Sequence, residues 1–233
     1  NWELCIADDA SSRPHVRRVL EKARLQDPRI KVVYRSDNGH ISAASNSACE
    51  LATGEFVALL DHDDVLPVHA LSMVAHAINQ HPDSDLFYSD EDKLDAAGRR
   101  HDPYFKPEWD EELICCQNFV SHLGVYRRSV MQRVGLFRPG FEGSQDYDLA
   151  LRVANATRGP IVHIPHVLYH WRRFHGSRTY SSTNLDRASD AARRAIADYL
   201  AARGEEVTVV AGAASYHRVI RRDPDVWPLV SVI

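Results

Sequence analysis

The stretch Glu55-Phe56-Val57-Ala58-Leu59-Leu60-Asp61-His62-Asp63-Asp64 decides the fold class. A short apolar run between Thr53-Gly54 and a group of acids is typical of a strand buried on both faces of a parallel sheet. The acids then lie at the carboxyl end of that strand, where open α/β sheets bind ligands. In extended geometry Asp61 and Asp63 project to the same side. Two such oxygen donors suit Mg²⁺ or Mn²⁺ bound to phosphates, and the alternative is a solvated acidic turn.

Composition narrows the class of protein. The 233 residues are 44% hydrophobic and 26% charged, which is ordinary for one sizeable globular domain. A net charge of −4 gives no broad electrostatic reason to expect a nucleic-acid partner. No apolar run approaches the roughly 18–20 residues that span a bilayer. Cys5, Cys49, Cys115 and Cys116 lack C-x-x-C spacing, so we expect reduced core thiols in a cytoplasmic protein.

Residues 1–95 alternate strand-like and helix-like segments. Strands are expected at 2–7, 30–34, 55–60 and 86–88, and helices from Pro14 to Pro28, at 42–52 and at 67–80. This rhythm predicts βαβ units and therefore an α/β fold with a mostly parallel central sheet flanked by helices. The run Ser89–Lys93 is expected to be a solvated loop, with a place beside the ligand crevice as the alternative.

The rhythm changes after residue 95. Residues 102–118 are aromatic and irregular, and a helix is expected at 145–156, an extended segment at 161–171 and a long helix at 184–203. Further strands are expected at 120–127, 207–210 and 216–220, and a short helix at 130–134. No linker separates the halves, so one domain over 1–226 is predicted.

The helix expected at 145–156 carries a second candidate residue. Asp146 is in register with the apolar stripe of that helix, so its carboxylate is expected on the buried face. Ser144 is the expected N-cap, which places Asp146 in the first turn. Asp148 is expected in a surface ion pair with Arg152. An inward carboxylate at a cleft is a candidate general base, and the alternative is a carboxylate that only caps its helix.

A third candidate group lies in the extended segment. Leu168, His170 and Arg172 share one side of it, which pairs an imidazole with a guanidinium suited to phosphate. The alternative is that His170 is simply packed or exposed, as most of the 13 histidines must be.

The first sheet edge supplies further polar residues. Asp8 and Asp9 follow the first strand, and Arg35 and Asn38 follow the next. Carboxyl ends of parallel strands share one edge, so these side chains are expected to line the same crevice, where Asp8 or Asp9 could accept hydrogen bonds from a base or ribose. Equally, the two acids could cap the helix that begins near Pro14.

These motifs together resemble those of the family-2 glycosyltransferases, which have the GT-A fold. The resemblance covers nearly the whole chain and is closest to enzymes of O-antigen and other bacterial surface polysaccharides. The matching segments are Asn1-Trp2-Glu3-Leu4, Asp8-Asp9-Ala10-Ser11, Asn38-Gly39, Asn46, Thr53-Gly54-Glu55-Phe56, Asp61-His62-Asp63-Asp64, Tyr88-Ser89-Asp90-Glu91-Asp92-Lys93, Gly143-Ser144-Gln145-Asp146-Tyr147-Asp148-Leu149 and Leu168-Tyr169-His170-Trp171-Arg172.

The resemblance implies an inverting transfer of sugar from a nucleotide sugar to a hydroxyl of a glycan or lipid-linked acceptor. Asp61 and Asp63 would hold Mn²⁺ or Mg²⁺ against the diphosphate, with His170 as a further ligand. Asp146 would be the catalytic base. The residues implied to bind the nucleotide sugar are Asp8, Asp9, Arg35, Asn38, Asn46, Asp61 and Arg172.

The same resemblance organises the chain around its substrates. Residues 1–95 would form the nucleotide-binding half and residues 96–226 the acceptor and catalytic half of a cytoplasmic enzyme. A lipid-linked acceptor would bring it to the inner face of the membrane. Two other functions compete: a degenerate domain that binds a nucleotide or glycan without turnover, and a metal-dependent phosphoester hydrolase.

Two departures from the family pattern bear on these expectations. Many relatives carry an arginine where this chain has Ser45, which removes one expected diphosphate contact. The family's first strand and helix should precede Asn1, and residues 227–233 look like the opening strand of a following transferase domain. A fragment of a longer tandem protein is therefore expected, and the strand near Val230 could pair beside residues 4–7, within the chain or between two copies.

Overall fold

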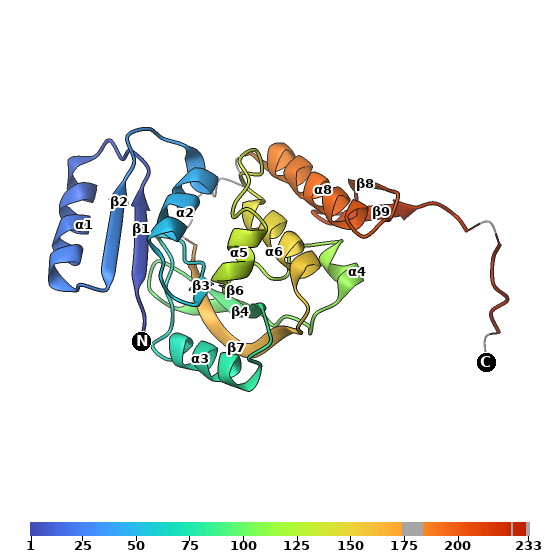
Figure 1. Ribbon diagram of the computed structural model, residues 1–233, viewed down its shortest axis with the longest axis horizontal. Helices are drawn as coiled ribbons and strands as arrows, with labels where there is room; N and C mark the ends of the chain where they lie inside the picture. Colours follow the sequence, from blue (N-terminus) through green and yellow to red (C-terminus); the bar gives the residue numbers. More distant parts are fainter. Residues whose placement is uncertain (174–183, 225, 232–233) are drawn as a thin grey trace.

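The computed structural model describes residues 1–173, 184–224 and 226–231. Its first part is a parallel pair of strands, β1 (Leu4–Asp8) and β2 (Ile30–Tyr34), in which Leu4 is opposite Ile30. Helices α1 (Pro14–Gln26) and α2 (His40–Leu51) flank this pair (Figure 1). Pro14 begins α1, where its missing N–H costs nothing. The expected alternation of strands and helices is present here.

The second sheet has five strands. β3 (Phe56–Ala58), β6 (Gly124–Arg127), β4 (Leu86–Leu94) and β5 (Arg100–Tyr104) follow one another in that order, and β7 (Ile161–Arg172) pairs with β4. The β4–β7 pairing is parallel, whereas β3–β6, β4–β6 and β4–β5 are antiparallel. The α/β class with a central sheet flanked by helices is confirmed. The prediction that the strand near Val57 is buried on both faces of a parallel sheet is wrong, because β3 is half-buried and pairs antiparallel with β6.

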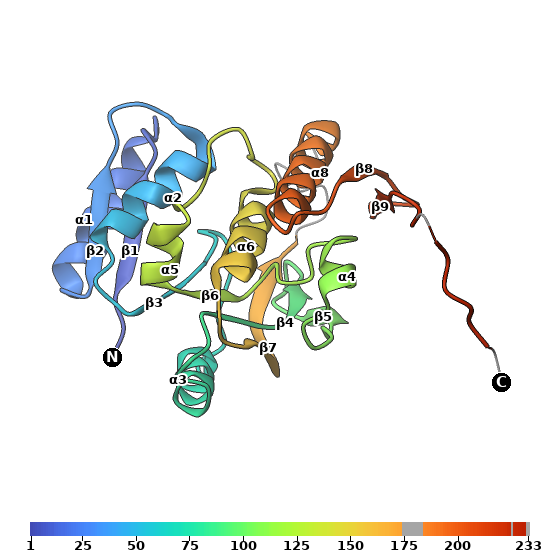
Figure 2. The same ribbon diagram turned by 45° about the vertical axis from the view of Figure 1, so that its right-hand side comes forward.

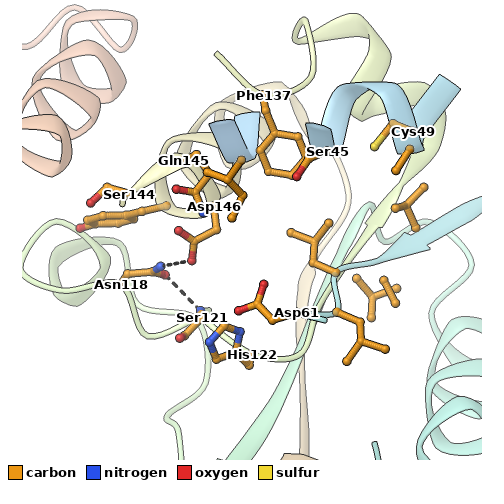
Figure 3. A pocket seen from close by; sticks show the side chains of 18 of the residues that line it. Ser45, Cys49, Asp61, Asn118, Ser121, His122, Phe137, Ser144, Gln145 and Asp146 are labelled. Carbon is orange, nitrogen blue, oxygen red and sulfur yellow. Dashed lines mark hydrogen bonds between the residues drawn. The ribbon is translucent and has the colours of Figure 1, made fainter. Parts of the chain in front are cut away.

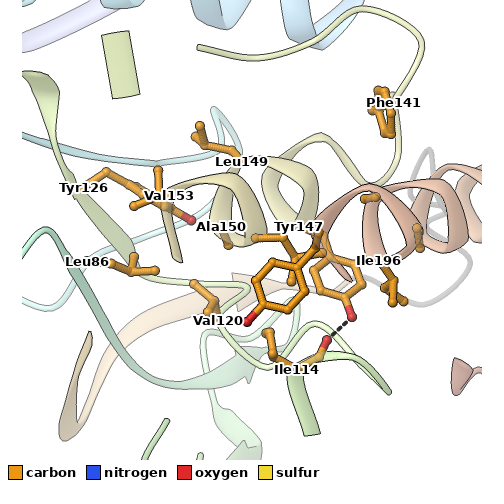
Figure 4. Close-up of a cluster of buried hydrophobic side chains, with 14 of the residues drawn as sticks. Leu86, Ile114, Val120, Tyr126, Phe141, Tyr147, Leu149, Ala150, Val153 and Ile196 are labelled. Atoms are coloured by element: carbon orange, nitrogen blue, oxygen red, sulfur yellow. Dashed lines mark hydrogen bonds between the residues drawn. The ribbon is translucent and has the colours of Figure 1, made fainter. Parts of the chain in front are cut away.

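Helices cover the second sheet and enclose the larger hydrophobic core (Figures 2 and 4). Leu86, Tyr126, Leu149 and Ile196 are all fully buried or nearly so in this cluster. Tyr147 lies among them, and its hydroxyl donates to the carbonyl of Ile114, which satisfies a buried polar group. The remaining elements are α3 (Ala70–Gln80), α4 (Glu111–Ile114), α5 (Arg128–Arg133), α6 (Gln145–Ala156), α8 (Leu185–Ala201), β8 (Val207–Ala211) and β9 (His217–Arg221).

The run Ser89–Lys93 is not a solvated loop, and that expectation is wrong. It continues β4, and Ser89, Asp90 and Asp92 are each at most 3% exposed. Their polar atoms have partners inside the protein: Asp90 accepts from the backbone N–H of Lys106 at 2.9 Å, and Asp92 contacts His170 and Arg100. Buried carboxylates persist when they are paired in this way.

The expected surface ion pair between Asp148 and Arg152 is also wrong in its location. Asp148 is fully buried and contacts two guanidinium groups, those of Arg138 and Arg152. Spacing along α6 indicates only Arg152, because Arg138 comes from the segment that precedes the helix. Ser144 does occupy the N-cap position, but its hydroxyl donates to the carbonyl of Ala188 at 2.9 Å and does not cap the helix.

The chain after β9 runs away from the body of the molecule, on the opposite side from β1 (Figures 1 and 2). Leu229 and Val230 are 97% and 73% exposed. Within the described residues, β1 pairs with β2. Pairing of residues 226–231 with residues 4–7 of the same chain is therefore wrong. Val232 and Ile233, the end of the predicted strand, lie outside the described residues, and pairing between two copies stays a prediction.

Two expectations about the whole chain can be compared with the structure. All four cysteines are free thiols, as expected. Among the described helices, none is long and apolar enough to cross a membrane.

Candidate functional site

A cavity of about 1030 Å³ lies where the two parts of the molecule meet. That volume is at the upper end of the range for small-molecule sites. Its lining comes from α2, β3, the loop 117–122 and the first turn of α6. Side chains of Asp61, Asn118, His122 and Asp146 point toward the same space from these separate elements (Figure 3).

One group of metal-ligand side chains occurs within residues 1–173, 184–224 and 226–231. Asp61, Asp64 and His122 each offer one ligand atom, and these atoms lie within 4.8 Å of one another. A turn after β3 brings the two acids together, since the N–H of Asp64 donates to the carbonyl of Asp61 at 3.3 Å. Residues i and i+3 converge in such a turn. The two carboxylates suit Mn²⁺ or Mg²⁺, whereas an imidazole ligand is more usual for zinc, iron, nickel or copper.

Strand β7 holds this group in place. The hydroxyl of Tyr169 donates to Asp64 Oδ2 at 2.6 Å and accepts from the backbone N–H of Asp61 at 3.2 Å. The backbone N–H of Arg172 donates to Asp64 Oδ1 at 2.8 Å. The His122 ring stacks on the Tyr169 ring with centroids 4.5 Å apart. Thus one tyrosine contacts all three members of the group.

The electrostatics of the cavity favour a cation. Partial burial raises the pKa of Asp61, His122 opposes this rise, and the neighbouring charges of Asp64 and Asp146 add to it. Burial also raises the pKa of Asp64, although the hydrogen bond from Tyr169 opposes it. The ionised carboxylates are therefore under-compensated by the protein. A divalent ion would supply the missing positive charge.

Asp146 faces this group from the other wall (Figure 3). It lies in the first turn of α6 and lines the cavity. Asn118 Nδ2 donates to Asp146 Oδ2 at 2.8 Å, while Asn118 Oδ1 accepts from the N–H of Ser121 at 3.1 Å. The carboxylate is thus oriented by an amide that is itself held, with its second oxygen available to accept a proton.

Two predicted metal ligands are not in the group that the structure brings together. The Asp63 side chain is 64% exposed, and its Oδ1 lies 3.9 Å from His62 Nδ1. His170 is buried, and its Nδ1 lies 2.5 Å from Asp92 Oδ1. Asp64 and His122 are therefore the candidate ligands that the structure brings beside Asp61, and metal binding by Asp63 and His170 stays a prediction.

The polar residues expected at the first sheet edge do gather, but around one another. Asp9 accepts from Arg35 Nε at 2.7 Å and from the N–H of Gly39 at 3.0 Å. Asn38 Nδ2 donates to the carbonyl of Asp9 at 3.1 Å, and Asp8 accepts from the N–H of Ser11. None of Asp8, Asp9, Arg35 and Asn38 is among the described residues that line the cavity. Their contact with a nucleotide stays a prediction.

Asn46 and Arg172 have structural contacts of their own. The Asn46 amide donates to the carbonyl of Phe137 at 2.8 Å and accepts from its N–H at 2.9 Å, so α2 is joined to the segment before α6. The Arg172 backbone supports Asp64, and the residue is exposed. Ser45, at the position where an arginine was expected, lines the cavity.

Sequence patterns missed four residues of the site. Asp64 is part of the acidic run, but extended geometry selects Asp63, and only the turn favours Asp64. His122, Asn118 and Tyr169 stand in no spacing pattern that signals chemistry. Their roles come from long-range contacts, which a single sequence does not display.

Comparison with known proteins identifies relatives. Residues 1–135 match the family model described as glycosyl transferase family 2. Over its whole length, the chain is 46% identical to the protein y4gI of Sinorhizobium fredii and 39% identical to the O-antigen biosynthesis protein RfbC of Myxococcus xanthus. It spans only 26% and 18% of these two proteins.

The fold also matches solved structures. The crystal structure of residues 1–349 of Staphylococcus aureus TarS in complex with UDP-GlcNAc superposes with a TM-score of 0.66. The alignment covers 85% of this chain and 57% of that one, at 20% sequence identity. This similarity shows a shared GT-A fold.

Proposed function

Because the chain belongs to glycosyl transferase family 2, we propose that it forms the sugar-transfer centre of an enzyme of bacterial surface-polysaccharide synthesis. The donor would be a nucleotide-diphosphate sugar, and the acceptor a hydroxyl of a glycan or of a lipid-linked saccharide. This acceptor would place the reaction in the cytoplasm, at the inner face of the membrane. The similarity to O-antigen biosynthesis protein RfbC supports the class of product.

One observation carries the proposal: Asp146 faces the Asp61–Asp64–His122 group across a single cavity. In a transfer with inversion, the acceptor hydroxyl attacks from the side opposite the leaving diphosphate. Asp146 would take the proton of that hydroxyl as the bond to the sugar forms. Asn118 orients the carboxylate for this role through its 2.8 Å hydrogen bond.

Asp61, Asp64 and His122 would hold the divalent ion that the donor set fits. Such an ion would neutralise the negative charge that develops on the departing nucleoside diphosphate. Tyr169 keeps Asp64 and the His122 ring in register with one another.

The test is the variant Asp146→Asn, with Asp190→Asn as its control because Asp190 is an exposed acid on α8. We expect nucleoside diphosphate release from a panel of nucleotide sugars with Mn²⁺ to fall by about 10²–10⁴-fold in Asp146→Asn, as loss of a general base predicts. Binding of UDP with Mn²⁺, measured by calorimetry, should stay within about threefold. Unchanged turnover in Asp146→Asn would remove this residue as the base.

A further inference from the structure

Lys106 and Glu91 form a buried ion pair that contacts the backbone of His122, a member of the metal-ligand group. The Lys106 side chain is fully buried, and that of Glu91 is 11% exposed. Lys106 Nζ donates to Glu91 Oε2 at 3.0 Å, to the carbonyl of Val120 at 2.9 Å and to the carbonyl of His122. An ammonium group has three N–H donors, so every one of them is used.

Glu91 closes the arrangement from the other side. Its Oε2 also accepts from the backbone N–H of His122 at 3.1 Å. Both backbone polar groups of His122 therefore end on this ion pair. Its ring, in turn, stacks on Tyr169 beside Asp61 and Asp64. The backbone of the only imidazole in the metal-ligand group of the described residues is thereby fixed.

The same loop reaches the opposite wall of the cavity. Asn118 donates to Asp146, and its side-chain oxygen accepts from the N–H of Ser121, the residue beside His122. Residues 118–122 thus touch the candidate base at one end and the metal-ligand group at the other. A shift of this loop would move both sides of the site relative to each other.

We propose that Lys106 and Glu91 are positioning residues that clamp the loop 118–122 and thereby set the geometry between Asp146 and the Asp61–Asp64–His122 group. This inference rests on the proposed function. It also gives a role to Glu91, which belongs to the acidic run Ser89–Lys93 that the proposed reaction leaves without one. Lys106 and Glu91 act through the loop and touch no substrate.

Energetics separate this role from simple stabilisation of the fold. Taking two charges out of water is costly, and replacing a buried ion pair by apolar residues of similar volume is often neutral or stabilising. Burial lowers the pKa of Lys106 while Glu91 opposes that shift, in keeping with such a cost. A purely structural pair could therefore be exchanged for Met without damage to the site. A clamp could not, because Met offers no N–H donors to the carbonyls of Val120 and His122.

The experiment compares Lys106→Met, Glu91→Gln and the double variant Lys106→Met/Glu91→Met with the unaltered chain. Mn²⁺ alone is the first probe, and its affinity is measured by electron paramagnetic resonance. The second readout is the imidazole spectrum of ¹⁵N-histidine-labelled protein without metal, with the His122 signals assigned from His122→Asn. Asp148→Asn is the matched control, since it breaks a different buried ion pair away from this loop.

We expect the Mn²⁺ affinity to fall about 10–100-fold in Lys106→Met and in the double variant, as for other residues that orient metal ligands. The His122 signals should shift or broaden in the same variants. Glu91→Gln should show a smaller loss, because its amide oxygen still accepts from the N–H of His122. Asp148→Asn should unfold more easily yet keep its Mn²⁺ affinity within about twofold.

Unchanged affinity together with unchanged His122 signals in Lys106→Met overturns the inference. A loss of affinity with unchanged His122 signals overturns it too, because the loss then has another cause. If the unaltered chain is folded but binds no Mn²⁺, that result contradicts the metal-ion role in the proposed function. The His122 signals still decide the clamp in that case, since they are recorded without metal.

Discussion

Asp61 combines a chemical role with an energetic cost. Its carboxylate lies near Asp64, Asp146 and His122, and partial burial is the main cause of its raised pKa. From its ordinary value of 3.8 up to the raised value, the native state holds more protons at this site than the unfolded state. Stability contributed by Asp61 is therefore full below that window and is lost as the pH rises through it.

The variant Asp61→Asn has no carboxylate to ionise, so its stability does not fall as the pH rises through this window. At pH 7 and without metal, we expect its melting temperature to exceed that of the unaltered chain by less than about 2 °C, because Asp61 is exposed and solvent screens the effect. Near pH 3, below the window, the two should melt together. Calorimetry at both values of pH, with and without Mn²⁺, measures the effect.

With Mn²⁺ present, the unaltered chain should have the higher melting temperature of the two. Mn²⁺ raises the melting temperature only of a chain that binds it, so we expect the rise in the unaltered protein and none in Asp61→Asn. Asp63→Asn is the matched control, because Asp63 is exposed and outside the group. A lower melting temperature for Asp61→Asn at pH 7 without metal would contradict the electrostatic argument.

At the residue scale, a local sequence pattern is enough to place some side chains at the cavity. Asp61 follows the half-buried strand β3 and Asp146 is in register with a helical stripe, and the structure places both at one cavity. The choice of Asp63 over Asp64 assumed an extended backbone, whereas the chain turns. His122 enters the site through its contacts with Tyr169, Lys106 and Glu91, which lie far from it in the sequence.

Among the elements, α6 carries two carboxylates with separate tasks. Asp146 reaches the cavity, while Asp148 is buried between the guanidinium groups of Arg138 and Arg152. Arg138 also contacts Asp198 on α8 at 2.8 Å. Asp148 therefore helps to hold α6 against the segment before it and, through Arg138, against α8.

We expect Asp148→Asn to lower the free energy of unfolding by about 2–4 kcal/mol, because it leaves two guanidinium groups without their buried counter-charge. We place this loss toward the low end of the range for broken buried ion pairs, because the side chains of both arginines are partly exposed to solvent. Urea unfolding followed by circular dichroism gives the number. Asp190→Asn breaks an exposed pair with Arg193 and should cost less than about 1 kcal/mol. Equal losses in the two variants would show that burial of Asp148 is not the source.

Element-scale prediction was accurate for helices and weaker for the sheets. The helix at 145–156 begins and ends where its apolar period predicts, and the strand at 30–34 does so as well. The strand β4 was cut short at Tyr88, because buried acids look like a solvated loop until their partners are known. Mixed pairing in the larger sheet could not be read from the order of elements alone.

At the scale of the whole molecule, the cavity lies between two sheets that are not hydrogen-bonded to each other. Successive residues of both β1 and β3 line it, including Leu4, Cys5, Val57 and Ala58. Neighbouring strand residues point to opposite faces, so a lining by successive residues means that strand edges face the cavity. An unpaired edge can add a further strand.

Removal of the residues after Pro224 tests what the exposed end of the chain contributes. Trp227, Leu229 and Val230 are at least 69% exposed, so we expect the melting temperature to change by less than about 1 °C. Light scattering on the same two samples tests pairing between copies. A dimer that becomes a monomer on truncation would support strand exchange, whereas a large drop in melting temperature of a monomer would contradict the exposed position.

The two hydrogen bonds between Asn46 and Phe137 also have an evolutionary consequence. They join α2 to the segment that leads into α6, so neither of the two can move without the other. If residues were inserted between Phe137 and Ser144 during evolution, the Asn46 side chain would have to move, or Asp146 would lose its alignment with the rest of the cavity. Length variation among descendants is therefore expected elsewhere, such as in the turn between β8 and β9.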